Sequence, residues 1–383
     1  MASDRAGVPP HRRAGNAHRW TAAVVAVVLA GGCQIVSGLS GLHEGSGGAS
    51  SASGGALSAS GGSTVASSSS GCAHDCADAG CTAAGICGAY VLVPDPGAGS
   101  GHVPNSLASD GTYVYWSVLI TGAVPGGFIH RQNIKAASGT DVVAMTIVPQ
   151  KLVVGGDFVS WIDGGFVTPV IKTARSDGST MGGTYTELSG QATNTLRAVG
   201  TSLVWNSANN ANSLEFGVVP SLSQVNTLTF ATPVTGFDMD AKRLFWSDSA
   251  GIYTHSLPLT GPNVSAQTPL FDPTNATQLV VDQVENGNVC WTTAKGVSWG
   301  PKNGKKPPGE WFSVPTQNVN QVLADASYIY WNDACTSTPA IHRVSVAGGA
   351  PVLIANPKTC GALAQDKASL YWIDQGNIYR WIK

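Results

Sequence analysis

The sequence predicts an all-β protein whose largest part is a seven-bladed β-propeller, with six blades as the alternative. Two observations carry this prediction. The 383-residue chain contains 47 glycines and only 11% of its residues are charged, a composition that favours short strands and turns over helices. Seven tryptophans also recur at the spacing of propeller blades: Trp116, Trp161, Trp205, Trp246, Trp291, Trp331 and Trp372.

Each of these tryptophans lies in an expected strand. The residue two positions earlier is aliphatic in every copy, and apolar residues two apart follow the period of a strand. In the first unit, residues 106–109, 113–118, 128–134 and 141–147 read as four strands, with a turn at Asp110–Gly111. Four strands in a unit of this length match one propeller blade.

The last unit is one strand short. Residues 361–364, 369–373 and 377–383 read as three strands, and the chain then ends. A further strand candidate, residues 90–94, precedes the first unit. We expect it to pair as the outer strand of the final blade, which closes the ring and removes the open edges between the first and last blades. Pro94 at its end suits an edge position.

Aspartates recur at two places in the units. We expect these carboxylates to accept backbone N–H groups in tight turns. Asp110, Asp240, Asp325 and Asp366 stand six residues before the tryptophan, and Asp163, Asp248, Asp333 and Asp374 stand two residues after it.

The Tyr-Trp-x-Asp copies resemble the YWTD propeller repeat of lipoprotein-receptor ectodomains and of bacterial lipoproteins. They are Tyr330–Asp333 and Tyr371–Asp374, with Phe245–Asp248 and Ser160–Asp163 as variants. The resemblance covers roughly residues 98–383 and implies a propeller architecture. Known YWTD propellers have six blades, so the seven units depart from that family pattern.

The first residues have the features of an export signal. Four arginines precede the apolar run Thr21–Ala30, which is too short to span a bilayer. We therefore assign residues 1–32 to a signal peptide. Leu29–Cys33 resembles the lipobox of bacterial lipoproteins, which implies that Cys33 is acylated; ordinary secretion is the alternative. In that family Gln34 in place of aspartate favours the outer membrane, with a secreted or periplasmic protein as the alternative.

Two short regions separate this signal from the propeller at residues 89–383. Residues 33–71 read as a flexible tether, because 24 of the 27 residues from Gly45 to Gly71 are Gly, Ser or Ala. Residues 72–88 form a cysteine-rich segment with two expected local disulfides and three possible pairings. A zinc site that includes His74 is the alternative. The four cysteines are Cys72, Cys76, Cys81 and Cys87.

The three remaining cysteines lie in the propeller. Cys335 follows the second strand of unit six, and Cys360 precedes the first strand of unit seven. In a propeller these two loops open on the same face, so we expect a disulfide between them. Cys290 precedes Trp291 in a central strand, where we expect a small buried apolar residue.

The sequence contains no recognised catalytic or nucleotide-binding motif, and we predict no enzyme, no catalytic residue and no cofactor. His130, His255 and His342 all fall in third strands of different units. Third strands lie far from the central channel, so we do not expect these histidines to form a metal site.

Acidic residues near the channel offer a second candidate site. Asp238 and Asp240 bracket the first strand of unit four, and Asp282 ends that of unit five. They could hold a cation, but turn capping explains them equally well, and we predict no metal site. Trp299 and Trp311 lie outside the repeat register and are candidates for exposed aromatics, with packing between blades as the favoured interpretation.

We expect a non-catalytic binding module of the cell envelope that presents its loops to a protein or glycan. The loops Ser117–Gly127 and Asn332–Ala340 support this expectation. We expect a monomer that contacts the membrane through its lipid anchor and binds no nucleic acid, because no basic patch is present. The alternatives are a passive structural protein and a metal-dependent lyase- or lactonase-like propeller enzyme, for which Glu285 is the candidate acid.

Overall fold

The structure is a computed structural model. It divides the chain into two units, Met1–Gly62 and Ser63–Lys383, and every described residue belongs to the second. The signal peptide, the tether and the cysteine-rich segment with Cys33, Cys72, Cys76, Cys81 and Cys87 lie outside the described residues. The described residues are 88–94, 102–121, 126–136, 140–164, 169–179, 186–188, 192–207, 210–220, 225–257, 268–272, 275–305, 312–316, 319–333 and 338–383.

The described residues form seven antiparallel sheets and contain no helix, and therefore no helix that could cross a membrane. The first three blades are complete in sequence order. Blade one contains β2 (His102–Ser109), β3 (Tyr113–Ile120), β4 (Gly126–Asn133) and β5 (Thr140–Thr146). Blade two contains β6 (Pro149–Gly155), β7 (Phe158–Asp163), β8 (Val170–Arg175) and β9 (Thr186–Leu188). Blade three contains β10 (Ala192–Val199), β11 (Ser202–Ser207), β12 (Ser213–Val218) and β13 (Asn226–Thr229).

Blade four differs from the others, because its sheet has three strands among the described residues. A single bridge between Ile252 and Phe271 lies where a fourth strand would pair. Blade four contains β14 (Gly236–Met239), β15 (Arg243–Ser247) and β16 (Ile252–Ser256). Blade five contains β17 (Leu279–Val281), β18 (Asn288–Thr293), β19 (Gly296–Pro301) and β20 (Phe312–Pro315). Blade six contains β21 (Val319–Ala324), β22 (Tyr328–Asp333), β23 (Ile341–Ser345) and β24 (Val352–Ala355).

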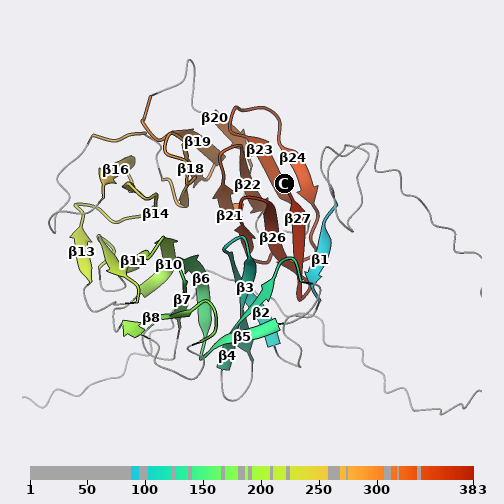
Figure 1. The fold of residues 1–383 in the computed structure, drawn as a ribbon. Coiled ribbons are helices and arrows are strands. Elements are labelled where there is room, and N and C mark those ends of the chain that lie inside the picture. Colours follow the sequence, from blue (N-terminus) through green and yellow to red (C-terminus); the bar gives the residue numbers. More distant parts are fainter. Residues whose placement is uncertain are drawn as a thin grey trace, which may run out of the picture. The chain divides into compact units, whose positions relative to one another are not determined.

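The seventh blade closes the ring. It contains β25 (Leu363–Gln365), β26 (Ser369–Asp374), β27 (Asn377–Ile382) and the early strand β1 (Tyr90–Val93). β1 pairs antiparallel with β27, with Tyr90 opposite Arg380, so the expected closure is confirmed (Figure 1). The Arg380 Nη1 group also donates to the Tyr90 hydroxyl at 2.9 Å.

The blades are arranged in a ring around their first strands. The first strand of each blade contacts the first strands of both neighbours, in the closed order β2, β6, β10, β14, β17, β21, β25 and back to β2 (Figure 1). The chain is therefore a seven-bladed β-propeller, and the six-bladed alternative is wrong.

The repeated tryptophans form the core between the blades. All seven are buried, with at most 4% of the side chain exposed. Burying an aromatic side chain of this size removes roughly 150–250 Å² of surface from water, which makes these residues the largest apolar contribution of each repeat.

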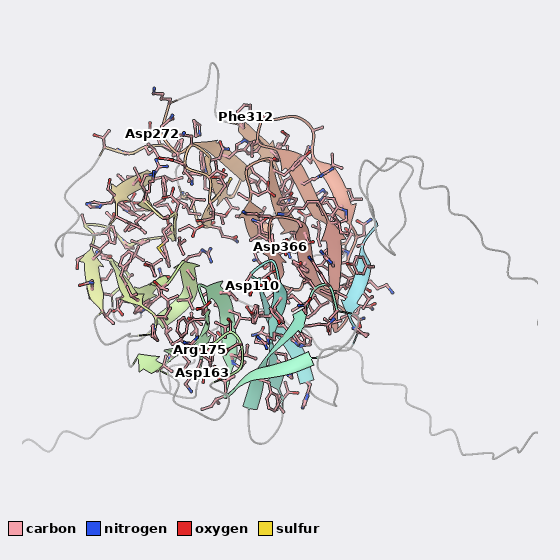
Figure 2. The ribbon with its side chains drawn as sticks, in the orientation of Figure 1. Asp110, Asp163, Arg175, Asp272, Phe312 and Asp366 are labelled. Atoms are coloured by element: carbon pink, nitrogen blue, oxygen red, sulfur yellow. The ribbon has the colours of Figure 1, made fainter. Side chains whose placement is uncertain are left out.

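The aspartates that precede the tryptophans cap the turns between first and second strands, as expected. In each copy one carboxylate oxygen accepts the backbone N–H groups two and three residues later, at 2.7–2.9 Å, in Asp110, Asp240, Asp325 and Asp366. Asp110 and Asp366 belong to neighbouring blades and lie near the centre of the ring (Figure 2). We call the face that carries these turns the turn face.

The aspartates that follow the tryptophans anchor the connections between blades. The hydroxyl of a threonine in each connection donates to the carboxylate, and the four pairs are Thr146–Asp163, Thr232–Asp248, Thr316–Asp333 and Thr359–Asp374. These connections and the loops between second and third strands lie at the other ends of the strands, on what we call the loop face.

Blade one extends further at the loop face than the sequence predicts. β3 continues to Ile120 and β4 begins at Gly126, so the expected loop Ser117–Gly127 shortens to residues 121–125. Likewise, β22 ends at Asp333 and β23 begins at Ile341, which reduces the loop of blade six to residues 334–340. The strand periodicity continues into residues that the sequence analysis assigned to loops.

Candidate functional site

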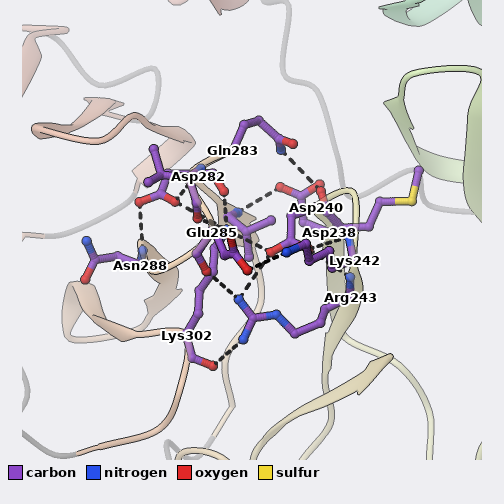
Figure 3. A network of polar contacts seen from close by, with 12 residues as sticks. Asp238, Asp240, Lys242, Arg243, Asp282, Gln283, Glu285, Asn288 and Lys302 are labelled. Atoms are coloured by element: carbon purple, nitrogen blue, oxygen red, sulfur yellow. Dashed lines mark hydrogen bonds and ion pairs between the residues drawn. The ribbon is translucent and has the colours of Figure 1, made fainter. Parts of the chain in front are cut away.

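A cluster of polar side chains lies on the turn face between blades four and five (Figure 3). Asp240 caps the β14–β15 turn, and Asp282 caps the equivalent turn of blade five by accepting the N–H of Asn288 at 2.7 Å and of Val284 at 3.2 Å. A side chain at Gly287 would overlap the Asp282 carboxylate, so the tight turn requires glycine there. Local turn chemistry therefore brings two carboxylates together.

A buried ammonium group occupies the space between these carboxylates. Lys302 follows β19, and only 1% of its side chain is exposed. Its Nζ atom lies 2.9 Å from Asp240 Oδ2 and 3.3 Å from Asp282 Oδ1. The same atom donates to the carbonyl of Val284 at 2.9 Å and to that of Asp282. Burial opposes ionisation of Asp240, but the hydrogen bonds from Lys302 and from the Lys242 N–H, together with the charges of Lys302 and Arg243, outweigh it and hold the pKa of Asp240 below its usual range.

Arg243 and Glu285 surround this buried cluster. The Arg243 guanidinium donates from Nη1 to the Lys302 carbonyl at 3.1 Å and from Nη2 to the Glu285 carbonyl at 2.8 Å. The Glu285 carboxylate pairs with Lys242 on the surface, where 66% of each side chain is exposed. This hydrogen bond lowers the pKa of Glu285. Glu285 is therefore an exposed, paired carboxylate and does not point at a shared site with Asp240 and Asp282.

Asp238 lies apart from Lys302, inside the ring. Its two oxygens accept the N–H groups of Val281 and Met239, each at 2.9 Å, and Arg197 Nε lies 3.6 Å from Oδ1. Burial raises the pKa of Asp238 despite the nearby Arg197. The carboxylate thus links β14 to β17 of the next blade. Within the described ranges, no three His, Cys, Asp or Glu side chains gather as metal ligands.

The histidines of the third strands contact residues of their own blades. His130 stacks on Trp116 with ring centroids 5.5 Å apart, and His342 stacks on Trp331 at 5.3 Å. Each lies directly opposite its tryptophan in the sheet, whereas His255 lies opposite Leu244. The three histidines are on blades one, six and four, and the structure does not bring them together.

His342 also shows a pairing rule that the sequence analysis missed. The residue opposite the tryptophan contacts the aspartate two residues beyond that tryptophan. His342 Nε2 lies 3.3 Å from Asp333 Oδ2, and Lys172 Nζ lies 2.7 Å from Asp163 Oδ2. Because these side chains are diagonal neighbours on one face of the sheet, the strand register alone could have identified the pairs.

Three arginines form bonds between blades that no sequence signal indicated. Each guanidinium donates to the carbonyl of the residue directly after the third strand of the next blade. The bonds are Arg131 to Ser176 at 2.7 Å, Arg243 to Lys302 at 3.1 Å and Arg380 to Ile134 at 3.1 Å. The shared acceptor position shows that the repeat includes contacts between units as well as within them.

The remaining candidates are buried or outside the described residues. Cys290 is fully buried, and burial raises its pKa. Trp299 is also buried; it stacks on Phe312 and donates to the Val346 carbonyl at 2.9 Å, which confirms packing between blades. Trp311 and Cys335 lie outside the described residues, so the disulfide between Cys335 and Cys360 stays a prediction.

Comparisons with known proteins support the fold alone. No protein-family model and no curated protein sequence matches this chain. Among solved structures, the AfRom2 CNH domain superposes with a TM-score of 0.54 at 12% identity, over 77% of this chain and 99% of that domain. BamB from Moraxella catarrhalis superposes with a TM-score of 0.47 at 11% identity, over 78% of this chain and 99% of that one.

Proposed function

We propose that this chain is a non-catalytic interaction module of the bacterial cell envelope, tethered through an acylated Cys33, that binds a protein or glycan with the loop face of blade one. The YWTD-like repeats and the signal-like N-terminus support the envelope assignment. The remaining question is which surface binds.

The single observation that carries the proposal is the extension of blade one beyond its neighbours. β3 continues four residues past Trp116, to Ile120, whereas the second strands of the other blades end one or two residues after their tryptophans. Two extra residues lengthen a strand by about 7 Å. The tip of blade one therefore projects from the loop face.

This projecting tip carries aromatic and apolar side chains that are partly exposed. His102 lies opposite Ile120, and the rings of His102 and Phe128 are 6.4 Å apart. Leu119 and Val103 lie opposite one another on the other face of the sheet. All five side chains are partly buried, so each keeps some surface for a partner. Aromatic groups on a rigid strand suit binding because little conformational entropy is lost when they are covered.

The carboxylates considered as cation ligands, and Glu285 as the candidate acid of the enzyme alternative, already have partners. Asp240 and Asp282 face Lys302, and Glu285 pairs with Lys242. This arrangement favours a structural role for the turn face, and it supports placing the binding surface at the opposite ends of the strands.

The test is ligand-dependent thermal unfolding of the mature chain with its disulfides intact. The panel contains oligosaccharides, peptidoglycan fragments and peptides. A ligand at a hundredfold its Kd adds about 2.7 kcal/mol to the native state. We expect Phe128→Ser to abolish the shift caused by the active panel member. The control Val352→Ser, on the outer strand of blade six where the side chain is 40% exposed, should keep it. A shift that survives Phe128→Ser would contradict the proposal.

A further inference from the structure

Two exposed valines lie at the outer rim of blades six and seven, on the sides of the sheets that face each other. Val91 lies opposite Tyr379 in blade seven, and Tyr379 shares its face with Trp381, which packs against blade six. Val352 lies opposite Arg343 in blade six, on the face that meets Trp381. Val91 and Val352 are 41% and 40% exposed. The outermost apolar side chains of these two facing surfaces are therefore left uncovered.

Arg343 lies one strand further in, with its guanidinium against two aromatic rings. The guanidinium carbon is 4.5 Å from the ring centre of Tyr328 in blade six and 5.1 Å from that of Trp381 in blade seven. No hydrogen bond or ion pair joins Arg343 to any residue that the structure describes. Its Nε atom and the Nε1 atom of Trp381 are buried donors without an acceptor in that part of the chain. Buried donors are rarely left unpaired, so this pair points to an acceptor that the described residues do not supply.

Blade one shows the same arginine position with its acceptor in place. Arg131 has the register of Arg343, and its guanidinium carbon also lies 4.5 Å from the centre of a tyrosine ring, that of Tyr113. Arg131 donates to the carbonyl of Ser176, directly after the third strand of blade two, at 2.7 Å. The corresponding residue of blade seven is Lys383, directly after β27, and Arg343 makes no hydrogen bond to it. The blade-to-blade bond of this position is thus missing between blades six and seven.

The N-terminal part of the chain enters the propeller beside this surface. Tyr90, the first residue of β1, lies opposite Arg380 near the turn-face end of β27. The cysteine-rich segment, residues 72–88, comes directly before it in the sequence. Asp78 precedes Tyr90 by 12 residues, and a chain of this length spans roughly 40 Å at most. Because packed sheets lie only about 10 Å apart, the segment is long enough to reach the facing surface of blade six.

The composition of this segment complements the surface. It contains Asp75 and Asp78 and no lysine or arginine, whereas Arg343 has no acidic partner among the described residues. It also contains Ile86, an apolar residue five positions before Val91. The segment therefore supplies both kinds of group that the surface lacks, a carboxylate for the guanidinium and an apolar side chain for the valines.

We propose that the cysteine-rich segment docks between the outer rims of blades six and seven. A carboxylate of Asp75 or Asp78 accepts charge-assisted hydrogen bonds from Arg343, whose guanidinium the two rings already hold in place. Ile86 covers Val91 and Val352. This contact fixes the point where the tether leaves the propeller, at the turn-face end of blade seven. The proposal is independent of the loop-face function, because the two surfaces share no residue.

The test is hydrogen–deuterium exchange of residues 72–88 in the mature chain with its disulfides intact. One variant is Arg343→Gln, and a second combines Asp75→Asn with Asp78→Asn. The matched control is Arg175→Gln in blade two, because Arg175 also lies against an aromatic ring, 5.6 Å from the centre of Phe158.

We expect exchange of residues 72–88 to become about tenfold or more faster in Arg343→Gln and in the aspartate variant. Combining all three substitutions should give no further increase, because they remove the same contact. Arg175→Gln should leave the exchange unchanged. The aspartate variant leaves the propeller sequence intact, so it tests the contact even where Arg343→Gln does not fold. Unchanged exchange of residues 72–88 in the aspartate variant would overturn the proposal.

Sedimentation of the same proteins distinguishes the segment from a second copy of the chain as the occupant of this surface. Docking of the segment predicts the same mass for the unmodified protein and for Arg343→Gln. A dimer of the unmodified protein that dissociates in Arg343→Gln would assign the surface to a second copy, and would also overturn the proposal.

Discussion

Replacing Lys302 by methionine tests how the ion cluster stabilises blades four and five. Methionine preserves most of the apolar length of the side chain and removes the ammonium group. The substitution leaves Asp240 and Asp282 facing each other, and Asp282 is fully buried. Removal of one partner from a buried ion pair costs about 3–5 kcal/mol, because the remaining charge is uncompensated. For a propeller of about 300 residues, such a loss lowers the melting temperature by about 5–8 °C.

The assay is thermal and urea unfolding, with Lys242→Met as the matched control. Lys242 and Glu285 are exposed partners, and exposed pairs contribute about 0–1 kcal/mol. Asp240→Asn combined with Asp282→Asn should restore part of the stability of Lys302→Met, because it removes the uncompensated charges. If the free energy of unfolding of Lys302→Met lies within about 0.5 kcal/mol of that of the unmodified protein, the ion cluster does not stabilise these blades.

The pH dependence gives an independent check on the same cluster. Lys302 holds the pKa of Asp240 below the unfolded value of 3.8. The stabilisation from this pair is therefore present above the unfolded pKa and is lost as the pH falls through the folded pKa. Because Lys302→Met lacks this stabilisation at every pH, the difference in the free energy of unfolding between the variant and the unmodified protein should become smaller below about pH 4.

Three further predictions concern other parts of the chain. Burial lowers the pKa of His130 from 6.5 to about 4, so the unfolded state binds the proton first, and the free energy of unfolding should fall as the pH decreases through this interval. His130→Phe, which can still stack on Trp116, should reduce this pH dependence in urea titrations. An unchanged pH dependence would contradict the role of His130. Arg380→Ala removes the hydrogen bonds to the Tyr90 hydroxyl and to the Ile134 carbonyl of blade one. It should destabilise the protein by about 2–3 kcal/mol and speed proteolysis near β1. Equal rates of proteolysis in the variant and the unmodified protein would argue that Arg380 does not hold this strand. Cys33→Ser should move the protein from the membrane fraction to the soluble fraction after cell fractionation, whereas retention in the membrane would show that acylation is not the anchor.

The architecture could be predicted from sequence because its signals are local and repeated. Strand period and tryptophan spacing identified the second strand of every blade, and Asp110 and Asp366 marked turns that lie within a few residues of the carboxylate. Even β1 was predictable, because a missing strand at one end of the chain and an extra strand at the other end must be reconciled in a closed ring.

The contacts between blades could not be predicted in the same way. Asp240 and Asp282 were identified as neighbours, but the cation between them is Lys302, which lies 62 residues from Asp240 in the chain. Nothing around Lys302 in the sequence indicates this partner, because its position depends on the packing of blade five against blade four. The bulge of β6 at Lys151, where φ is 46° and the register against β7 shifts, was also missed, because the sequence analysis set no register for the first strands.

The most direct test of the proposed binding surface is hydrogen–deuterium exchange with and without the panel member that raises the melting temperature. We expect slower exchange in peptides that cover residues 102–104, 118–120 and 126–128, at the loop-face end of blade one. We expect no change in peptides that cover residues 240–248 and 282–305, on the turn face between blades four and five. Protection confined to the turn face, or no protection in blade one, would contradict the proposed binding surface.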